Sequence, residues 1–532
     1  MQKKIQIKIP VPEGSDEQVI RELLAKDAGI PSGSINGFRI LKRSLDARSR
    51  YPHILLTASV FIREPVQPRE VFEQPVRDLK QSPKSVLIVG AGPAGLFAAL
   101  SLIRSGIRPV LLERGKEIRA RRRDLARLNK EGIINPESNY CFGEGGAGTY
   151  SDGKLYTRSN KRGNIQRILD LFVRFGAEEN ILYDAHPHIG TNKLPGIIRA
   201  MRDYIIACGG EIHFGKKLTG WSEIREKISE IQTADGDRFL ADAFILATGH
   251  SARDIYQLFQ DKEKEIQAKP FALGLRVEHP QELINSIQYH YIREQGPHVT
   301  GLPPAAYQLI HSENRRSVFS FCMCPGGIVA PASSNEGELV VNGWSPSKRN
   351  NPFANSGIVV NIEERDWQAF SKHGALAAMF FQSAIEQQAF VAGGGLFRAP
   401  AQRLTDFVKG KISDSLPTCS YIPGLNSADI PVIFPKDIAR CLQQAFPAFG
   451  EKMKGYFTQE AIVVATESRT SSPIRIPRDE KTLSHPQIHN LFPCGEGAGY
   501  AGGIMSAAMD GERVAEKIAE MLSPKMIIHG HA

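Results

Sequence analysis

The sequence predicts an α/β fold, in which a Rossmann-type nucleotide-binding domain is assembled from segments far apart in the chain. A buried apolar strand running into a glycine-rich turn and a helix occurs near each end, as VLIVGAGPAGLFAAL at 86–100 and LFPCGEGAGYAGGIMSAAMDG at 491–511. Between them, 266–464 reads mainly as short alternating strands. Because a helix start presents unpaired N–H groups and a positive dipole end, two such starts suit one anionic ligand gripped at both ends.

The first turn carries the G-x-G-x-x-G spacing in full. Gly90 allows the tight turn, Gly92 lets a pyrophosphate approach the backbone, and Gly95 lets the helix pack on the strand. A second strand, 109–112, ends at Glu113, where a carboxylate is expected to accept ribose hydroxyls and to repel a 2′-phosphate. The residues expected at the nucleotide are Gly90, Gly92, Pro93, Ala94, Gly95, Glu113 and Arg114.

The second turn favours FAD over NAD. Residues 491–493 are expected to form the last parallel strand of the same sheet, with Glu496 placed to take a ribityl hydroxyl. The helix that follows would direct its amides at the flavin N1–C2=O edge, where the reduced ring is anionic. An NAD enzyme has no use for this second device. The residues expected here are Gly495, Glu496, Gly502, Gly503 and Ile504.

Three further segments fall where an FAD domain needs them. The glycine-dense loop 141–155 would let its backbone approach the ligand, 213–218 reads as a third parallel strand near the adenine, and 242–251 is a buried strand. A basic helix is expected at 118–130, mostly as a solvated face, with one arginine reaching the phosphates. The residues assigned to the cofactor from these segments are Arg121, Gly145, Gly146, Leu218, Thr248 and Gly249.

These motifs carry a family resemblance. VGAGPAGL, LLERG, ILATG and GEGAGYAGG together resemble the two-dinucleotide-domain, glutathione-reductase-like flavoprotein superfamily. More narrowly, FGEGGAGTYSDGKL, HPHIGTNKL, CMCPGG and ESRTSSPIRI look like a bacterial family of FAD-dependent dehydrogenases, that is, NAD(P)/FAD-dependent oxidoreductases, over about residues 1–520. The resemblance implies the fold and the FAD cofactor but no particular substrate.

The domain organisation follows from placing the strands. Alternation at 4–9, 38–45 and 53–62 with a helix at 16–26 predicts a small N-terminal βαββ domain. The middle region should form a mainly antiparallel α+β substrate domain, with strands at 271–280, 305–311, 317–323 and 337–344 and a helix near 366–388. The expected divisions are 1–63 for the N-terminal domain, 64–83 for a proline-containing linker, 84–265 and 465–523 for the two parts of the FAD domain, 266–464 for the substrate domain and 524–532 for a tail.

Composition is that of an ordinary globular enzyme. The 532 residues are 42% hydrophobic and 23% charged, and no apolar run is long enough to span a membrane. The N-terminus alternates like a strand, and seven cysteines, an odd number, favour reduced thiols; together these predict a cytoplasmic protein. The net charge of +9 would help to attract an anionic ligand, but basic residues are not interleaved with aromatic ones, so nucleic acid is not an expected partner. No H-x-x-x-H or C-x-x-C pattern predicts a metal site.

Bound flavin would carry the hydride or electron transfer, so side chains beside it are the catalytic candidates. Ser151 and Lys154, with Thr149, lie in the glycine-dense loop. Arg469 and Arg475 would clamp a substrate carboxylate, or else make a salt bridge between domains.

The remaining candidates are thiols and imidazoles. Alternation places Cys322 and Cys324 on one face of a strand, either as packing residues or as a thiol pair near the flavin. His186, His188 and His250 are candidates for proton transfer or for capping. Cys141 and Cys494 precede glycine segments, where a small packing residue is explanation enough.

No second G-x-G-x-x-G follows a strand between 150 and 480, so a separate NAD(P)H domain is not expected. The electron partner would then be a small-molecule substrate, a quinone, oxygen or a transiently docking NAD(P)H. The sequence therefore predicts an FAD-dependent dehydrogenase or reductase of a small anionic organic substrate. An FAD-containing RNA-modification protein and an FAD-bound docking or sensory module remain as alternatives.

Overall fold

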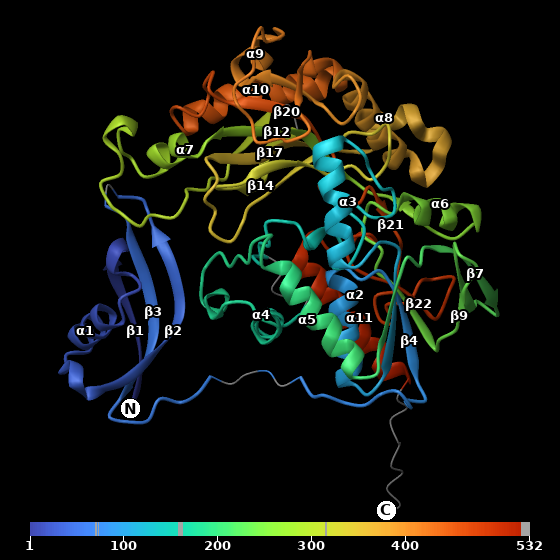
Figure 1. Ribbon diagram of the computed structural model, residues 1–532, viewed down its shortest axis with the longest axis horizontal. Helices are drawn as coiled ribbons and strands as arrows, with labels where there is room; N and C mark the ends of the chain where they lie inside the picture. The colour runs from blue at the N-terminus through green and yellow to red at the C-terminus, as the bar shows by residue number, and fades with distance from the viewer. Residues whose placement is uncertain (50, 70–71, 73, 158–162, 314–315, 523–532) are drawn as a thin grey trace, which may run out of the picture.

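The computed structural model describes residues 1–522 except 50, 70–71, 73, 158–162 and 314–315. The predicted tail, 524–532, lies outside the described residues, as do residues 70, 71 and 73 of the predicted linker 64–83. Figure 1 shows a small N-terminal unit at the left, joined by the linker to a larger body in which two sheets meet. In the described part of the chain, no helix is both long and apolar enough to cross a bilayer.

The N-terminal unit is a three-stranded antiparallel sheet with one helix, in the strand order β1-β3-β2. Ile5, Ile7 and Ile9 alternate along β1 and pack with α1, so the period-2 pattern of the sequence is confirmed. The carboxylate of Asp16 caps α1 by accepting from two backbone amides. The elements are β1 (Gln2–Pro10), α1 (Glu17–Ala28), β2 (Ile35–Asp46) and β3 (His53–Ile62).

The Rossmann-type sheet is parallel and five-stranded, in the order β22-β10-β4-β5-β6. Its strands come from both ends of the chain, as the two glycine-rich turns predict. They are β4 (Ser85–Val89), β5 (Arg108–Glu113), β6 (Glu211–Phe214), β10 (Ala243–Leu246) and β22 (Leu491–Pro493). The predicted third strand at 213–218 is therefore displaced, since β6 ends at Phe214 and Leu218 begins another strand.

The two faces of this sheet are covered differently. Alternate side chains such as Val86 and Ile88 pack under helices, whereas Leu87 and Val89 pack under a small antiparallel sheet and one helix. The first face carries α2 (Pro93–Arg104), α4 (Ile165–Arg174), α5 (Leu194–Ala207) and α11 (Ile504–Leu522). The second carries β7 (Leu218–Ile224), β8 (Lys227–Thr233), β9 (Arg238–Phe239) and α6 (Arg253–Asp261).

The second large sheet has seven strands in the order β13-β14-β17-β12-β20-β18-β19 and is antiparallel except between β18 and β19. It lies at the top of Figure 1, with α9 and α10 above it and α8 at its right-hand end. Its strands are β12 (Phe271–Pro280), β13 (Ile310–Glu313), β14 (Arg316–Cys324), β17 (Phe353–Ile362), β18 (Ala399–Arg403), β19 (Leu425–Ser427) and β20 (Ile462–Glu467). The helices are α7 (Gln281–Gln288), α8 (Ala377–Ala392), α9 (Leu404–Lys409) and α10 (Lys436–Lys452).

The central strand β12 shows how this sheet separates its faces. Leu273, Leu275 and Val277 join the apolar core under the helices. Arg276 points to the opposite face, where it is fully buried and ion-paired to Glu467 at 2.7 Å. This polar face is covered by the hairpin β15 (Ile328–Pro331) and β16 (Val341–Trp344), and it faces the parallel-sheet unit.

Two details of this region differ from the sequence expectation. The helix expected near 366–388 is interrupted, because Gly374 has φ 56° and ψ −129°; a 3₁₀ segment, Gln368–Leu376, precedes α8. Of the expected strands 305–311 and 337–344, only the ends lie in observed strands, in β13 and β16 respectively. The short ribbon of β11 (Gln267–Ala268) and β21 (Ile474–Arg475) pairs the chain where it enters this unit with the chain where it leaves. The expected boundary between 464 and 465 falls inside β20, which runs to Glu467 in the antiparallel sheet. The division into domains stays a prediction.

Candidate functional site

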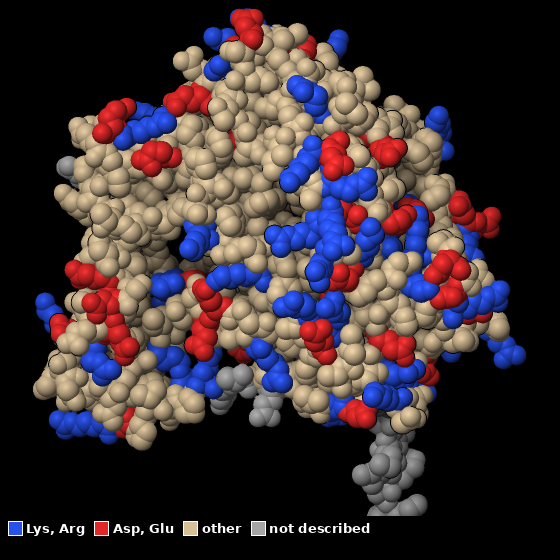
Figure 2. Space-filling view, in the orientation of Figure 1, with Lys and Arg blue, Asp and Glu red and all other residues tan. Residues whose placement is uncertain are grey.

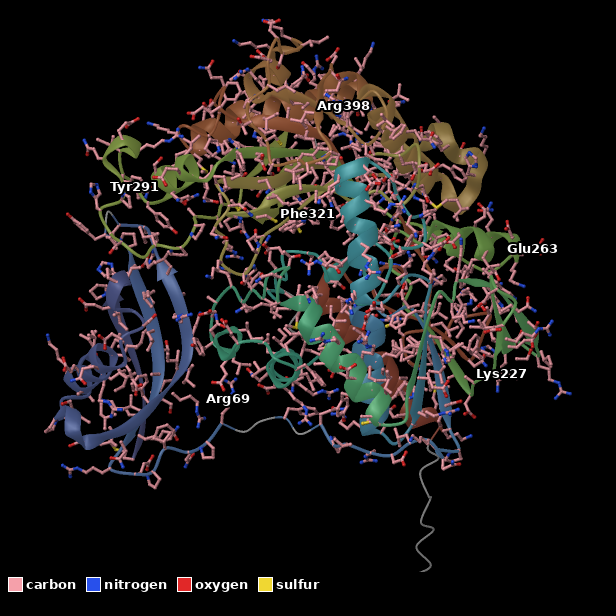
Figure 3. The ribbon with its side chains drawn as sticks, viewed as in Figure 1. Arg69, Lys227, Glu263, Tyr291, Phe321 and Arg398 are labelled. Atoms are coloured by element: carbon pink, nitrogen blue, oxygen red, sulfur yellow. The ribbon has the colours of Figure 1, made fainter. Side chains whose placement is uncertain are left out.

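A cavity of about 410 Å³ lies between the carboxyl edge of the parallel sheet and the polar face of the antiparallel sheet. Both glycine-rich turns reach it: Gly90 and Gly92 from the start of α2, and Gly502 and Gly503 from the start of α11. Phe321, labelled on β14 in Figure 3, lines the opposite wall. Segments about four hundred residues apart in sequence therefore meet at one site, as predicted.

The α2 turn is built by close backbone approaches that only glycine permits. A Cβ on Gly90, whose φ is +108°, would lie 2.3 Å from the carbonyl oxygen of Ala247, just past the end of the neighbouring strand β10. A Cβ on Gly95 would lie 2.0 Å from the carbonyl oxygen of Gly90. Gly92, Pro93 and Ala94 line the cavity, whereas Gly95 does not. Gly95 is thus a packing residue of the turn rather than part of the cavity wall.

Glu113 ends β5 at the cavity and organises the turn around it. Its buried carboxylate accepts the backbone amides of Ala91 at 3.0 Å, Gly115 at 2.9 Å and Gly143 at 3.0 Å. The residue therefore ties three loops together at the place where the ribose is expected. Its contact with ribose hydroxyls stays a prediction.

The closing turn packs directly against the opening one. A Cβ on Gly511 of α11 would lie 2.1 Å from the carbonyl oxygen of Ala94 in α2, so the two helices touch backbone to backbone. Gly495 does not line the cavity; its amide is held by Asp510 at 2.8 Å, and Asp510 pairs with Arg478 at 2.6 Å.

Four predicted residues of this turn and the helix after it do form the cavity wall: Glu496, Gly502, Gly503 and Ile504. The carboxylate of Glu496 lies 3.4 Å from the imidazole of His250.

Arg121 corrects a prediction about the phosphates. Its side chain is fully buried and does not line the cavity, and its guanidinium donates to the carbonyl oxygens of Asn139, Tyr140 and Glu144. Glu144 belongs to the glycine-dense loop and the other two residues directly precede it, so Arg121 shapes that loop instead of binding the ligand. The other basic side chains of α3 (Ile118–Glu131) are exposed, and Figure 2 shows the blue cluster that they form over this helix.

The glycine-dense loop contributes unevenly to the cavity. Gly146 and Ser151 line it, but Gly145 and Thr149 do not. A Cβ on Gly145 would lie 2.1 Å from the hydroxyl oxygen of Thr149, which donates to Glu144 at 2.7 Å. Gly145 and Thr149 therefore stabilise the loop without lining the cavity. The hydroxyl of Ser151 donates to the carbonyl oxygen of Gly148 at 2.8 Å, within the same loop.

Beside Glu113, the cavity wall is cationic but balanced. The predicted residues Leu218, Thr248 and Gly249 line the cavity. Sequence reasoning missed Lys217, which together with Arg114 shares the carboxylates of Glu137 and Asp254. Lys216 lies beside it and pairs with two aspartates of the β8–β9 turn. The two adjacent lysines in HFGKKL, 213–218, were the sequence feature that could have indicated this cationic part of the wall.

Arg469 corrects the predicted carboxylate clamp. It borders the cavity, but its guanidinium donates to both carboxylate oxygens of Glu386 at 3.1 and 2.9 Å and to Ser334 at 2.6 Å. Arg253 and Glu338 complete the buried ion cluster. The alternative of a salt bridge between segments is what the geometry shows, since its members come from α6, α8 and the chain after β20. Arg475 is exposed and lies over the ring of Tyr500, 5.5 Å from its centroid.

The two strand cysteines both line the cavity. Regular alternation is broken between them by a bulge against β17, where Cys322 has φ +46°. Cys322 is open to the cavity yet deep in the molecule, and removal from bulk water raises the pKa of its thiol to about 11 against the opposing charge of Lys154. Cys324 is buried and donates to the carbonyl oxygen of Cys322 at 3.1 Å.

Lys154 lies beside these thiols. Its ammonium donates to the carbonyl oxygen of Met323 and lies 3.6 Å from the sulfur of Cys324 and 3.4 Å from the carboxylate of Asp152. Burial disfavours the charged form, but the attraction of the neighbouring thiols, where they ionise, and of the Asp152 carboxylate outweighs it and raises the pKa of Lys154. Lys154 is therefore a cation in the cavity wall at neutral pH.

Asp152 is a residue that sequence reasoning missed, although it lies inside the quoted loop. It is 5% exposed, and neither carboxylate oxygen has a hydrogen-bond partner among the described residues. Three cationic or titratable groups surround it at longer range: Lys154 at 3.4 Å, His188 at 3.6 Å and Arg349 at 3.6 Å. Arg349 carries no sequence signal, because only the fold brings it to this loop.

The remaining candidates are distributed around the cavity. Of the three histidines, His250 lines it, whereas His186 packs against Tyr156 and His188 lies behind Asp152. Cys141 borders the cavity, and Cys494 is fully buried outside it. Within the described residues, no group of three His, Cys, Asp or Glu side chains is placed to hold a metal ion.

The residues at the two turns of the cavity fit FAD. Gly92 and Gly146 face each other so closely that a Cβ on Gly146 would lie 3.1 Å from the Cα of Gly92. At Gly502 and Gly503, no atom lies within 4 Å of the position that a Cβ would take. The two residues directly before α11 are therefore open to a ligand. The residues that would hold the dinucleotide are those of the α2 turn and Glu113 at one end and those of the α11 turn at the other.

Family models match three parts of the chain. Residues 270–470 match "FAD-dependent protein, C-terminal domain-like", residues 84–127 match "FAD binding domain", and residues 1–61 match "Domain of unknown function (DUF8436)". The first two matches cover the antiparallel sheet and the opening Rossmann turn, which are the two walls of the cavity.

Whole-chain comparisons extend these matches. An uncharacterized protein of Clostridium beijerinckii is 36% identical over 523 residues, which are 95% of this chain and 96% of that protein. Two solved structures share 12% and 13% identity: the tetracycline destructase Tet(51), with 82% and 81% of the two chains covered and a TM-score of 0.34, and CtdE in complex with FAD, with 81% and 84% covered and a TM-score of 0.31. Likeness at this level does not extend to a common activity. The chain belongs to the same family as the Clostridium protein, and it is a flavoprotein whose cofactor is FAD.

Proposed function

We propose that this protein is an FAD-dependent oxidoreductase, a dehydrogenase or reductase of a small organic substrate that enters the cavity opposite the glycine-rich turns. The observation that carries the proposal is the single cavity shared by both helix N-termini and by the thiol- and lysine-bearing wall of the antiparallel sheet. Its finer placement among the bacterial FAD-dependent dehydrogenases rests on the longer motifs of the sequence, such as FGEGGAGTYSDGKL and CMCPGG.

The residues divide the work by position. Bound FAD supplies two-electron chemistry at its ring, and the chain supplies orientation, electrostatics and access. The α11 N-terminus offers its first-turn amides and a positive dipole end to a group that gains negative charge. The amide of Gly502, just before it, is held by the hydroxyl of Ser506 at 3.1 Å. Arg469 and its carboxylates hold the antiparallel unit against α6 at the cavity edge, so that the substrate wall is fixed relative to the cofactor wall. The wall formed by β14 and β16 is left for the substrate.

The proposal is tested by spectroscopy of the purified protein. We expect it to be yellow and to release FAD on denaturation. Under anaerobic conditions, NADH, NADPH and a panel of amino, hydroxy and unsaturated acids would be added in turn while bleaching of the visible band is followed. Bleaching by a nicotinamide would identify a reductase, and bleaching by an acid would identify a dehydrogenase. A protein that holds FAD but is neither reduced by any of these nor reoxidised by quinones, oxygen or unsaturated acids after chemical reduction would overturn the assignment as an oxidoreductase.

A further inference from the structure

We propose that Lys154 marks the binding site for the carboxylate of a small organic acid, at the part of the cavity bordered by β14. This inference rests on the proposed function, because it names the substrate class of that same cavity. It also replaces Arg469 and Arg475 as the anion-binding groups, since one is committed to buried carboxylates and the other lies over Tyr500.

The charge balance around the cavity singles out Lys154. The cations Arg114 and Lys217 share two carboxylates, those of Glu137 and Asp254. Arg469 and its neighbour Arg253 likewise share Glu338 and Glu386. Lys216 has Asp235 and Asp237 to itself.

Around Lys154, the cationic side chains outnumber the carboxylates. Lys154 and Arg349 share the single carboxylate of Asp152, with the imidazole of His188 as a further neighbour. The distances of 3.4 to 3.6 Å are long for ion pairs, and both oxygens of the nearly buried Asp152 lack a hydrogen bond among the described residues. Of the ion clusters described at the cavity wall, this one therefore carries an excess of positive charge. Because a partly desolvated cation favours a counter-ion, an entering carboxylate would complete the cluster.

The neighbouring thiols support this reading of the wall. Cys322 and Cys324 are held as neutral thiols at neutral pH, because burial raises the pKa of both. They therefore add no negative charge beside Lys154. The S–H of Cys324 donates to the carbonyl oxygen of Cys322, so Cys322 is the thiol that can offer a donor to an anion. The bulge at Cys322, where the backbone has φ +46°, turns that thiol to the open side of the wall. Cys322 thus stands next to the proposed site and can report on it.

The experiment uses Cys322 as a chemical probe in the FAD-loaded protein. Iodoacetate and iodoacetamide alkylate thiols by the same displacement, but only iodoacetate is anionic. Their rates at Cys322 would be measured at about pH 9 by peptide mass spectrometry and divided by their rates at a free cysteine peptide, which cancels intrinsic reactivity. We expect the normalised ratio to favour iodoacetate by about tenfold or more in the unaltered protein.

Variants then test the role of the ammonium group. Lys154→Met is expected to abolish the preference, and Lys154→Arg is expected to retain most of it. Lys193→Met removes a half-buried lysine that pairs with Glu178 and does not line the cavity; it changes the net charge equally and should leave the ratio unaltered. A normalised ratio near one in the unaltered protein, or no labelling of Cys322 by either reagent, would overturn the proposal without any variant being needed.

A second measurement separates this inference from the proposed function. Benzoate and benzamide would be titrated into the FAD-loaded protein, and binding would be read from the visible difference spectrum of the cofactor. Benzoate is expected to bind at least about tenfold more tightly, and Lys154→Met is expected to remove that advantage. Equal binding of the acid and the amide by a protein that still turns over would sink the carboxylate site while leaving the oxidoreductase intact.

Discussion

Replacing Glu386 by glutamine tests whether the ion cluster at the cavity edge is structural. Glu386 is fully buried and receives both Arg469 and Arg253, whose nitrogens lie 2.9 and 2.8 Å from one of its oxygens. Glutamine keeps the size of the side chain but removes its charge. Two buried guanidinium groups would then be left with the single carboxylate of Glu338.

The expected loss of stability follows from the pKa of Glu386. Burial raises it, but Arg253 and Arg469 outweigh burial and lower it from 4.5 to about 2. A difference of about 2.5 pH units corresponds to roughly 3 to 3.5 kcal/mol of unfolding free energy, since each unit is worth about 1.4 kcal/mol. Because the folded-state pKa lies below the unfolded one, this contribution is fully present above about pH 4.5 and is lost as the pH falls towards 2.

The assay is urea unfolding followed by tryptophan fluorescence. At pH 7, Glu386→Gln should lower the free energy of unfolding by about 3 kcal/mol, and the exposed control Glu451→Gln should change it by less than about 0.5 kcal/mol. The gap between the unaltered protein and the variant should narrow below about pH 4.5. A loss of less than about 1 kcal/mol at pH 7 would refute the reasoning, because Arg469 would then not depend on Glu386 and would be free to act as the carboxylate clamp.

Three further predictions address the cofactor wall and the thiol. Gly95→Val should strip the purified protein of its yellow colour, because its Cβ would stand 2.0 Å from the carbonyl oxygen of Gly90; retention of one FAD per chain would contradict this geometry. Glu113→Ala should weaken FAD binding by about tenfold or more and lower stability by about 2 kcal/mol, since three backbone amides lose their acceptor; unaltered FAD affinity by fluorescence titration would argue against that role. Alkylation of Cys322 by iodoacetamide should rise about tenfold per pH unit from pH 7 towards its pKa of about 11, because only the thiolate reacts. A rate already at its plateau at pH 7 would show a thiolate stabilised by Lys154 instead.

Local patterns in the sequence were sufficient for the main architecture. The G-x-G-x-x-G spacing, the apolar runs before it and the alternation of residues 4–9 depend on neighbours in the chain, so the parallel strands and the N-terminal unit were predictable. The joining of 86–100 to 491–511 was also predictable, because each half offers a helix start that one extended anionic ligand would use. These segments met at one cavity as expected.

The functions of individual charged residues were not predictable in this way. Arg121 and Arg469 were assigned to ligands because each lies near a motif, yet both are buried against partners that adjacent motifs do not reveal. Arg349, which shares Asp152 with Lys154, is separated from it by almost two hundred residues.

The sequence by itself thus determined the nucleotide-binding fold and its two glycine-rich turns, because backbone conformation and apolar periodicity are encoded locally. The tertiary structure decided which cations are neutralised and which one still faces the cavity. An ion pair depends on the distance between side chains, and that distance is settled only when the parallel and antiparallel sheets pack together.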